Sequence, residues 1–275
     1  MFAYFNLVSL NAMKAFELLS YLQTLNGGWV NLNETVDTFK SGDPDAEILG
    51  IAVAWMSYTW ALQRAIELGC NVFITHEPTY YDHSDKNTKI FDLPGVDGKQ
   101  KFIEENKLII LRCHDLWDQM PGIGITDSWG ELLGFGRAID GEGYFRVYGV
   151  SGKTALQVAQ QVVSRIKPFG QEAVELVGPP DRQVTRVSVG TGAIVSFLGC
   201  VLQYKVDLAV CTDDGITYWR DGAYATDMGI PFIVVNHAVS EEVGVMNLAK
   251  YLHTSFPDIP LYHIPQKCMY RLISG

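Results

Sequence analysis

The chain has 275 residues, of which 48% are hydrophobic and 19% are charged. This length and composition suit one large domain or two smaller ones with a buried core, and they argue against a disordered chain. The formal net charge of −10, from 21 basic and 31 acidic residues, disfavours nucleic-acid binding, because a phosphate backbone requires a basic surface.

The five cysteines stand singly along the chain, so neither a disulfide framework nor a cysteine zinc site is expected. No apolar run reaches the length of a membrane span, and the first residues carry no basic segment. We therefore expect a cytoplasmic protein with no membrane segment, in which the residues before Met13 form a short extension.

The first part of the chain alternates between helical and strand patterns. AMKAFELLSYLQTL predicts a helix after Met13, and VDTFKSGDPDAE predicts a loop. A buried strand (ILGIAVAW), a helix closed by Gly69 and a second strand (NVFIT) then form a strand–helix–strand unit. A further helix (KQKFIEENK) and strand (LIILRC) lead to a Gly-rich loop at 121–136.

The alternation continues to the C-terminus. The expected strands and helices are, in order, GYFRVYGV, TALQVAQQVVSRI, TRVSVGTGA, IVSFLGCVLQY, DLAVCT, GAYATDMG, PFIVVN and SEEVGVMNLAKYLHTSF. The pattern predicts an α/β fold of two similar halves with mixed or parallel sheets, residues 13–135 and 186–275. Residues 140–185 are expected to bridge these halves.

Two glycine-containing motifs are better explained by local structure than by nucleotide binding. SGKT at 151–154 lacks the P-loop glycine five residues before Gly152, where Val147 stands, and Thr154 is expected to cap a helix. GTGAIV at 190–195 has Val195 in place of the third glycine of a dinucleotide fingerprint. We therefore interpret it as a turn, although an anion at the following helix would fit, and a nucleotide-dependent oxidoreductase is disfavoured.

Three apolar strands end in an imidazole followed by a carboxylate within four residues. These pairs are, in chain order, His76 with Glu77, His114 with Asp118, and His237 with Glu241. The carboxyl ends of parallel strands share one sheet edge, so we expect the pairs to meet there. Such ligands are typical of first-row divalent metals, and their number suits two ions a few Å apart.

The remaining site expectations concern single residues. Ser240 is expected to cap the last helix, which places Glu241 in its first turn and His237 just outside it. The lone histidines, His83, His253 and His263, are expected to have structural or surface roles.

The same residues carry a resemblance to a known family. THEP, HDLWD and NHAVSEEVGV resemble three motifs of the Nif-three-like family of NGG1-interacting-factor-like dinuclear metal proteins, also called GTP cyclohydrolase 1 type 2-like. Those motifs are T-H-H-P, H-T-x-x-D and G-H-x-x-[ST]-E-x-x-G. The resemblance runs in order from about Met13 to the C-terminus, and VDTFKSGDPDAEI is similar to the family's first loop.

The resemblance implies one unit of two similar α/β domains, often assembled as a hexameric ring of dimers, with two divalent metal ions. The implied ligands are His76, Glu77, Asp118, His237 and Glu241. His114 then remains as a general acid or base. The ions that such proteins could hold are Mn, Fe, Mg or Zn.

The chain departs from the family motifs at several positions. Glu77 replaces the second histidine, Asp115 replaces threonine and could compete with Asp118, and Asn236 replaces glycine. TDD at 212–214 stands in place of T-G-[ED]. Three carboxylates and two neutral imidazoles give the shell a charge of −3, which favours Mn²⁺, Mg²⁺ or Fe²⁺ over Zn²⁺.

Two functions follow from these expectations. The first is a metal-dependent hydrolase that uses a metal-bridging water on a nucleotide or other phosphorylated or heterocyclic small molecule. The second is a non-catalytic metal-binding or interaction protein whose oligomeric ring is the functional unit. An open coordination position facing a cavity would favour the hydrolase.

Overall fold

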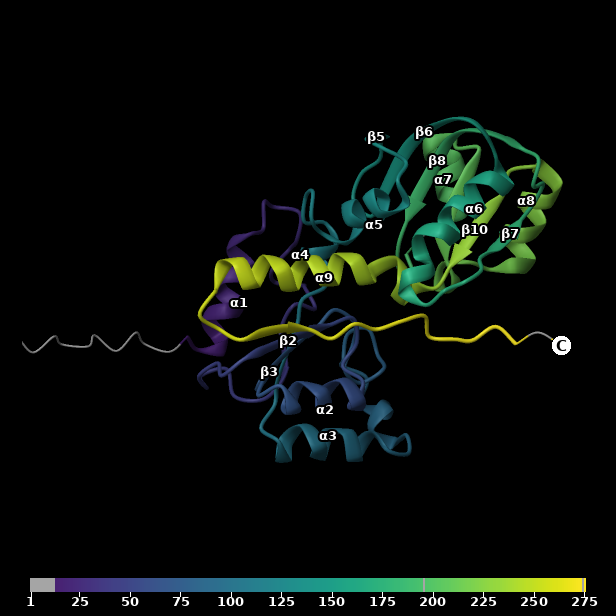
Figure 1. Ribbon diagram of the computed structural model, residues 1–275. Helices are drawn as coiled ribbons and strands as arrows, with labels where there is room; N and C mark the ends of the chain where they lie inside the picture. Colours follow the sequence, from purple (N-terminus) through teal and green to yellow (C-terminus); the bar gives the residue numbers. More distant parts are fainter. Residues whose placement is uncertain (1–12, 195, 274) are drawn as a thin grey trace, which may run out of the picture.

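The chain folds into two β-sheets, each with helices on both faces (Figure 1). The computed structural model describes residues 13–194, 196–273 and 275. The predicted α/β class with mixed sheets is confirmed, whereas the extension expected before Met13 lies outside the described residues.

The first sheet has five strands in the order β1-β4-β3-β2-β11. Their bounds are β1 (Phe39–Ser41), β2 (Ile51–Ala54), β3 (Val72–Thr75), β4 (Ile109–Arg112) and β11 (Leu261–His263). Only β1 runs antiparallel to its neighbour. Every residue of β2, β3 and β4 is buried, as their continuous apolar runs predict for strands covered on both faces.

Helices cover both faces of the first sheet. One face packs against α1 (Ala15–Thr24) and α9 (His237–Ser255), and the other packs against α2 (Thr59–Glu67) and α3 (Val96–Glu105) (Figure 1). A short helix, α4 (Asp115–Asp118), follows β4, and the 3₁₀ turn η1 (Thr88–Asp92) precedes α3.

The second sheet has six strands in the order β5-β6-β8-β9-β10-β7, of which β8, β9 and β10 are parallel. Their bounds are β5 (Ala138–Asp140), β6 (Phe145–Thr154), β7 (Glu175–Val177), β8 (Gln183–Gly190), β9 (Leu208–Thr212) and β10 (Phe232–Val235). The antiparallel strands β5, β6 and β7 therefore lie outside a parallel centre.

Helices also cover the second sheet on both faces. One side packs against α5 (Ile125–Leu133) and α6 (Ala155–Ile166), and the other against α7 (Phe197–Tyr204) and α8 (Ala223–Met228). Short turns connect these elements: η2 (Lys167–Phe169), η3 (Asp213–Gly215) and η4 (Tyr218–Gly222). Thr154 caps α6 in a capping box with Gln157, as its position predicted.

The chain is distributed between the sheets differently from the expected division. Residues 140–185 contribute β6, α6 and β7 to the second sheet, because β6 pairs along most of its length with β8. After β10 the chain returns, and α9 and β11 complete the first sheet. In Figure 1, α9 lies between the two sheets, beside α5.

A glycine allows this helix to lie close to α5. A Cβ added at Gly244 of α9 would come within 2.7 Å of the Ile125 Cα of α5. The Trp117 indole of α4 also donates a hydrogen bond of 2.8 Å to the Gly244 carbonyl. Three helices thus meet at one point, which fixes α9 relative to the loop after β4.

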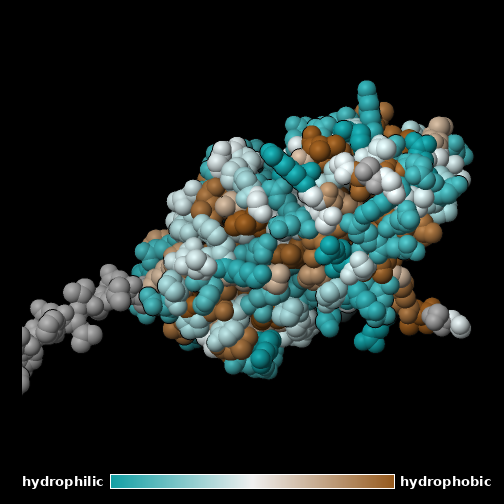
Figure 2. Space-filling view, turned by 45° about the horizontal axis from the view of Figure 1, so that its top comes forward, coloured by the Kyte–Doolittle hydropathy of each residue, from teal (hydrophilic) through white to brown (hydrophobic). Residues whose placement is uncertain are grey.

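On the face that Figure 2 shows, polar residues cover most of the surface, with apolar patches between them. The C-terminal segment projects from the body, and its Leu272 and Ile273 are exposed. None of the described helices has both the length and the apolar character needed to cross a membrane.

Candidate metal centre

The predicted imidazole and carboxylate residues come together where the strands of the two sheets end. His76 and Glu77 follow β3, and Asp118 ends α4 just after β4. His237 and Glu241 lie on the first turns of α9, just after β10. We expected one shared sheet edge, whereas β3 and β4 belong to the first sheet and β10 to the second. The carboxyl ends of both sheets therefore face the same centre.

His76 is buried and has one nitrogen fixed by the backbone. Its Nδ1 donates to the Cys113 carbonyl at 3.1 Å, so Nε2 is left to face the cluster. That Nε2 lies 3.3 Å from Asp118 Oδ1 and 3.3 Å from Glu241 Oε2. Burial opposes the charged imidazole, but Asp118 and Glu241 outweigh it and raise the pKa of His76 well above its usual range.

His237 repeats this arrangement from the other sheet. Its Nδ1 donates to Asp214 Oδ2 at 2.7 Å, and its Nε2 lies 3.0 Å from Glu241 Oε1 and 3.3 Å from Glu77 Oε1. Burial is again outweighed by the carboxylates, which raise the pKa of His237 well above its usual range. Asp214 is the third residue of the TDD segment and matches the [ED] position of the family motif, so a residue that agrees with the motif orients this candidate ligand.

Glu241 stands between the two imidazoles and uses both of its oxygens. Oε2 faces His76 and accepts a hydrogen bond of 2.8 Å from the Trp55 indole, while Oε1 faces His237 and accepts one of 2.9 Å from Thr191. Burial would raise its pKa, but the two imidazoles lower the pKa of Glu241 well below its usual range. The side chain is therefore a fixed, ionised carboxylate shared by both histidines.

Glu77 divides its carboxylate between the cluster and a buried arginine. Oε1 faces His237, and Oε2 lies 3.5 Å from Arg112 Nη2. Burial opposes ionisation, yet the contact with His237 lowers the pKa of Glu77 to about 2. Arg112 is fully buried, and it also donates to the carbonyls of His76, at 3.0 Å, and of His83. It thereby fixes the loop that carries both candidate ligands.

The residues after β4 separate into a support and a ligand. Asp115 accepts hydrogen bonds from Thr35 Oγ1 at 2.8 Å and from the Val36 amide at 3.1 Å, so it holds the first loop rather than the cluster. Asp118 faces His76 instead. Of the two aspartates that the sequence left open, Asp118 is the one with the geometry of a ligand.

His114 lies beside this group. Its Nδ1 is 2.8 Å from Asp115 Oδ1, its ring stacks on His76 with centroids 4.7 Å apart, and its Nε2 is 3.9 Å from Glu77 Oε1. Burial is outweighed by Asp118 and Asp115, which raise the pKa of His114. The position fits a proton donor, and it also makes His114 a candidate ligand.

The donor set fits a metal ion. Among the described residues, two groups could hold one, His76–His114–Asp118 and His76–Glu77–Glu241. The Nε2 atoms of His76 and His237 are buried without an aligned hydrogen bond. Each of these rings has its Nδ1–H fixed by a carbonyl or a carboxylate, which is how proteins orient metal-binding histidines.

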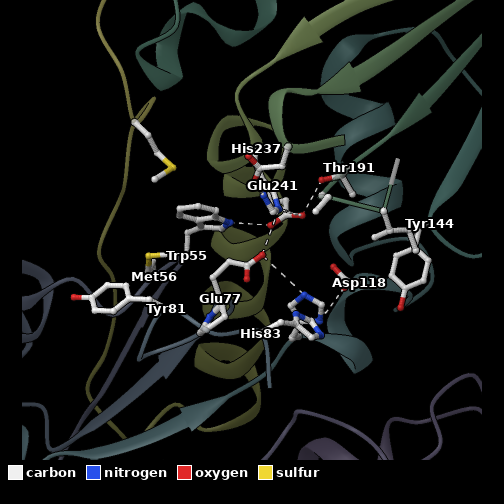
Figure 3. A pocket seen from close by; sticks show the side chains of 17 residues that line it. Trp55, Met56, Glu77, Tyr81, His83, Asp118, Tyr144, Thr191, His237 and Glu241 are labelled. Atoms are coloured by element: carbon white, nitrogen blue, oxygen red, sulfur yellow. Dashed lines mark hydrogen bonds and ion pairs between the residues drawn. The ribbon is translucent and has the colours of Figure 1, made fainter. Parts of the chain in front are cut away.

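The cluster opens into a cavity of about 370 Å³ (Figure 3). Met56 and Tyr81 lie on one side of the candidate ligands and Tyr144 on the other. The exposed His83 also lines this cavity, so it lies at the wall of the candidate site, which the sequence did not predict. The two other lone histidines lie elsewhere: His253 is exposed on α9, and His263 Nε2 lies 3.0 Å from Glu242 Oε1.

Sequence reasoning missed four residues that shape the cluster. They are Trp55, Thr191, Gly192 and Asp214. Gly192 belongs to GTGAIV, and its φ of +70° lets the turn pass the cluster: a Cβ there would lie 3.4 Å from Glu241 Oε1. The sequence analysis interpreted GTGAIV as a turn. Because this motif begins at the end of β8, a parallel strand, its position was the signal that could have assigned Gly192 to the site.

The expected start of the last helix was wrong. α9 begins at His237, not after Ser240, and its N-cap residue is Asn236. Ser240 Oγ instead donates to the His237 carbonyl at 2.7 Å within the helix. His237 and Glu241 are therefore four residues apart on one helix, so their side chains lie on the same face.

A family model described as Duf34/NIF3 (NGG1p interacting factor 3) matches residues 32–267. The chain belongs to this family. Two curated relatives bear the name GTP cyclohydrolase 1 type 2 homolog. The Chlamydia pneumoniae protein is 22% identical over 254 residues, 89% of this chain and 95% of the relative. The Clostridium acetobutylicum protein is 24% identical over 236 residues, 81% of this chain and 84% of the relative.

Solved structures share the Duf34/NIF3 fold. A hypothetical protein of Staphylococcus aureus matches with a TM-score of 0.75 at 18% identity, over 96% of this chain and all of that one. A Bacillus cereus protein related to NIF3 matches with a TM-score of 0.76 at 14% identity, over 96% of this chain and 99% of that one. At these identities the likeness shows the fold alone.

Proposed function

We propose that this Duf34/NIF3 chain is a metal-dependent hydrolase that acts on a nucleotide or another phosphorylated or heterocyclic small molecule. The observation that carries the proposal is the cavity of about 370 Å³ into which the candidate ligands open. A catalytic metal site keeps a coordination position open for water or substrate, whereas a structural site is closed by protein ligands. The names of the two curated relatives agree with a cyclohydrolase-like activity.

The position of Glu241 supports two ions rather than one. Its two oxygens face different imidazoles, so His76 and Asp118 form one half of the centre, and His237 and Glu77 form the other. The cofactors that we propose are two divalent ions of Mn, Fe, Mg or Zn. The oxygen-rich ligand set favours the harder ions of that group.

Different residues of the chain have different roles in the proposed reaction. Bound divalent ions would supply Lewis-acid catalysis, by activating water and stabilising negative charge on the substrate. Asp118 and Asp115 raise the pKa of His114 and so favour its charged form, and its Nε2 faces the cluster, where it could deliver a proton to a leaving group. Asp115 holds the His114 ring through Nδ1 and keeps that Nε2 toward the cluster.

The cellular location and the oligomeric state of the protein belong to the same proposal. We infer a cytoplasmic location and a homo-oligomer, such as the hexameric ring that the family resemblance implies. The exposed Tyr218 and Trp219 on η4 support a protein contact of this kind. They also favour the alternative function, a non-catalytic interaction protein whose ring is the functional unit.

Elemental analysis of the purified protein tests the metal centre first. We expect about two divalent ions per chain after reconstitution with Mn²⁺, Fe²⁺ or Zn²⁺. His237→Ala and Glu77→Ala should each lower the metal content. His253→Ala is the matched control, because His253 lies on the same helix, α9, but is exposed and far along it.

A second measurement separates the enzyme from the interaction protein. The metal-loaded chain is assayed on a panel of phosphoesters, nucleotides and heterocycles, beside His237→Ala and His114→Ala. Metal-dependent turnover that both variants lose, with metal retained in His114→Ala, supports the hydrolase and the proton-transfer role. Loss of metal in His114→Ala would make that residue a ligand, and the absence of bound metal in the wild type would leave the interaction protein.

A further inference from the structure

Tyr81 adopts a backbone conformation that a tyrosine rarely takes. Its φ of +66° lies in the left-handed region, where Cβ crowds the backbone. Among the described residues, the other three non-glycine residues with positive φ are an aspartate and two lysines, Asp85, Lys107 and Lys205. Tyr81 is thus the only aromatic residue of this set, and strain of this kind is retained where it serves a site.

The strained backbone places the tyrosine ring on the wall of the cavity. The ring lines the cavity next to Glu77 and Met56, and the residue remains 55% exposed (Figure 3). The Lys99 ammonium lies 5.0 Å from the ring centroid, within cation–π range. Lys99 is itself buried and donates to the Thr79 carbonyl at 2.6 Å, so it is a fixed support. Lys99 thus supports the Tyr81 ring, while part of the ring surface stays exposed.

The charged residues that line the cavity indicate which class of ligand could stack on the Tyr81 ring. None of the described residues that line it is a lysine or an arginine, whereas its carboxylates are Glu77, Asp118, Asp214 and Glu241. Two divalent ions would carry four positive charges, which these four carboxylates balance, and the basic groups that line the cavity are the imidazoles of His83, His114 and His237. Proteins that bind a triphosphate add lysine or arginine donors to the metal, and this cavity has none among its described residues.

We propose that Tyr81 is a substrate-binding residue that stacks on an uncharged, flat heterocycle, which narrows the substrate class to nucleosides, free bases or similar rings without a phosphate chain. Met56 lies on the same side of the candidate ligands as Tyr81, and Met269 also lines the cavity, so thioether groups are available to such a ring, while Tyr144 lines the opposite side. The inference rests on the proposed hydrolase, because it assigns the substrate of that same site.

The test measures binding to guanosine, adenosine and their 5′-triphosphates by calorimetry, on the metal-free protein and on the protein with Mn²⁺ in excess over nucleotide. The variants are Tyr81→Phe, Tyr81→Ala and Tyr81→Gly, with Tyr262→Ala as the control for loss of an exposed tyrosine outside the cavity. Melting temperature and metal content are measured on the same samples.

We expect nucleosides to bind more tightly than triphosphates, Tyr81→Phe and the control to bind like the wild type, and both Tyr81→Ala and Tyr81→Gly to bind about tenfold more weakly. Tyr81→Gly should melt at a higher temperature than Tyr81→Ala, because glycine accepts a positive φ without strain. Equal loss of binding in two variants of different stability identifies a contact with the ligand rather than a structural role.

Three results would overturn the inference: no nucleoside binding by the wild type, unchanged binding in Tyr81→Gly, or tighter binding of the triphosphates. Its failure is distinct from that of the proposed function. A protein that holds two ions and turns over a phosphorylated substrate, but does not bind nucleosides, keeps the hydrolase and loses this substrate class. A protein without metal loses the hydrolase, whether or not Tyr81 binds a ring.

Discussion

Lys99 is a buried amine whose position behind Tyr81 has a consequence for stability. Burial lowers the pKa of Lys99 to about 8, from an ordinary value of 10.5, and Asp85 only partly opposes this shift. Between these two pH values the folded chain has released the proton while the unfolded chain still holds it. The free energy of unfolding therefore gains a contribution that increases with pH across this window.

We predict that Lys99→Met removes this pH dependence. The difference in unfolding free energy between the wild type and Lys99→Met should change in favour of the wild type as pH rises from 8 to about 9.5. Urea unfolding at several pH values measures it, with the exposed Lys101→Met as control. Parallel pH profiles for the wild type and Lys99→Met would contradict a buried, readily deprotonated amine.

At the residue scale, the sequence predicted the candidate ligands better than it predicted their support. His76, Asp118, His237 and Glu241 were recognisable because each follows an apolar strand. Arg112 was not, since the last residue of a buried strand is usually apolar and nothing local indicates that its guanidinium turns toward the His76 and His83 carbonyls. Trp55 and Thr191 likewise approach Glu241 from distant parts of the chain.

At the scale of elements, the start of α9 is set by a neighbouring strand. Asp213, which follows β9, accepts a hydrogen bond of 2.9 Å from the His237 amide and one of 2.7 Å from Asn236 Nδ2. It thus replaces the side-chain cap that Asn236 does not provide. A local pattern such as S-E-E cannot indicate a cap that comes from another strand, which is why Ser240 was chosen wrongly.

We predict that Asp213→Ala destabilises the protein by about 1 kcal/mol, as loss of a helix N-cap does. It should also weaken metal binding, because His237 is the first residue of the helix that Asp213 holds. Urea unfolding and metal titration measure the two effects, and the exposed Asp227→Ala serves as control. Unchanged metal affinity would show that His237 is placed without this cap.

Most strands and helices were predictable because their apolar periodicity is strong. The pairing of the strands was not. β6 could be assigned to the second sheet only through its partner β8, and β11 has just three residues, too few for a pattern to be recognised. The sequence therefore indicated the α/β class and most of the elements, but the loop predicted at 121–136 was wrong, because α5 (Ile125–Leu133) lies there. Long-range pairing decided which sheet each element joined.

At the scale of the whole molecule, the candidate centre joins the two sheets. His76, Glu77 and Asp118 follow strands of the first sheet, and His237 and Glu241 follow a strand of the second. A ligand bound by residues of both should stabilise the native state as a unit, because it has no comparable site in the unfolded chain.

We predict that divalent metal raises the melting temperature and that a chelator reverses this. At a free metal concentration of 100 times Kd, one site contributes about 2.7 kcal/mol. Differential scanning calorimetry with Mn²⁺ or with EDTA measures the shift, which His237→Ala should abolish and His253→Ala should retain. An identical melting temperature with and without bound metal would mean that the ions bind the unfolded chain as well as they bind the native state.

The return of the chain to its first sheet also bears on how the protein is made. β11 pairs with β2, and α9 covers a face of the same sheet, so the first sheet needs residues from both ends of the chain. A nascent chain on the ribosome therefore cannot complete that sheet until residues 237–263 have been made, and the part of the apolar face that α9 covers stays open until then. His237 and Glu241 are also made after the strands that carry His76 and Asp118, so the candidate centre cannot form before residue 241 has left the ribosome.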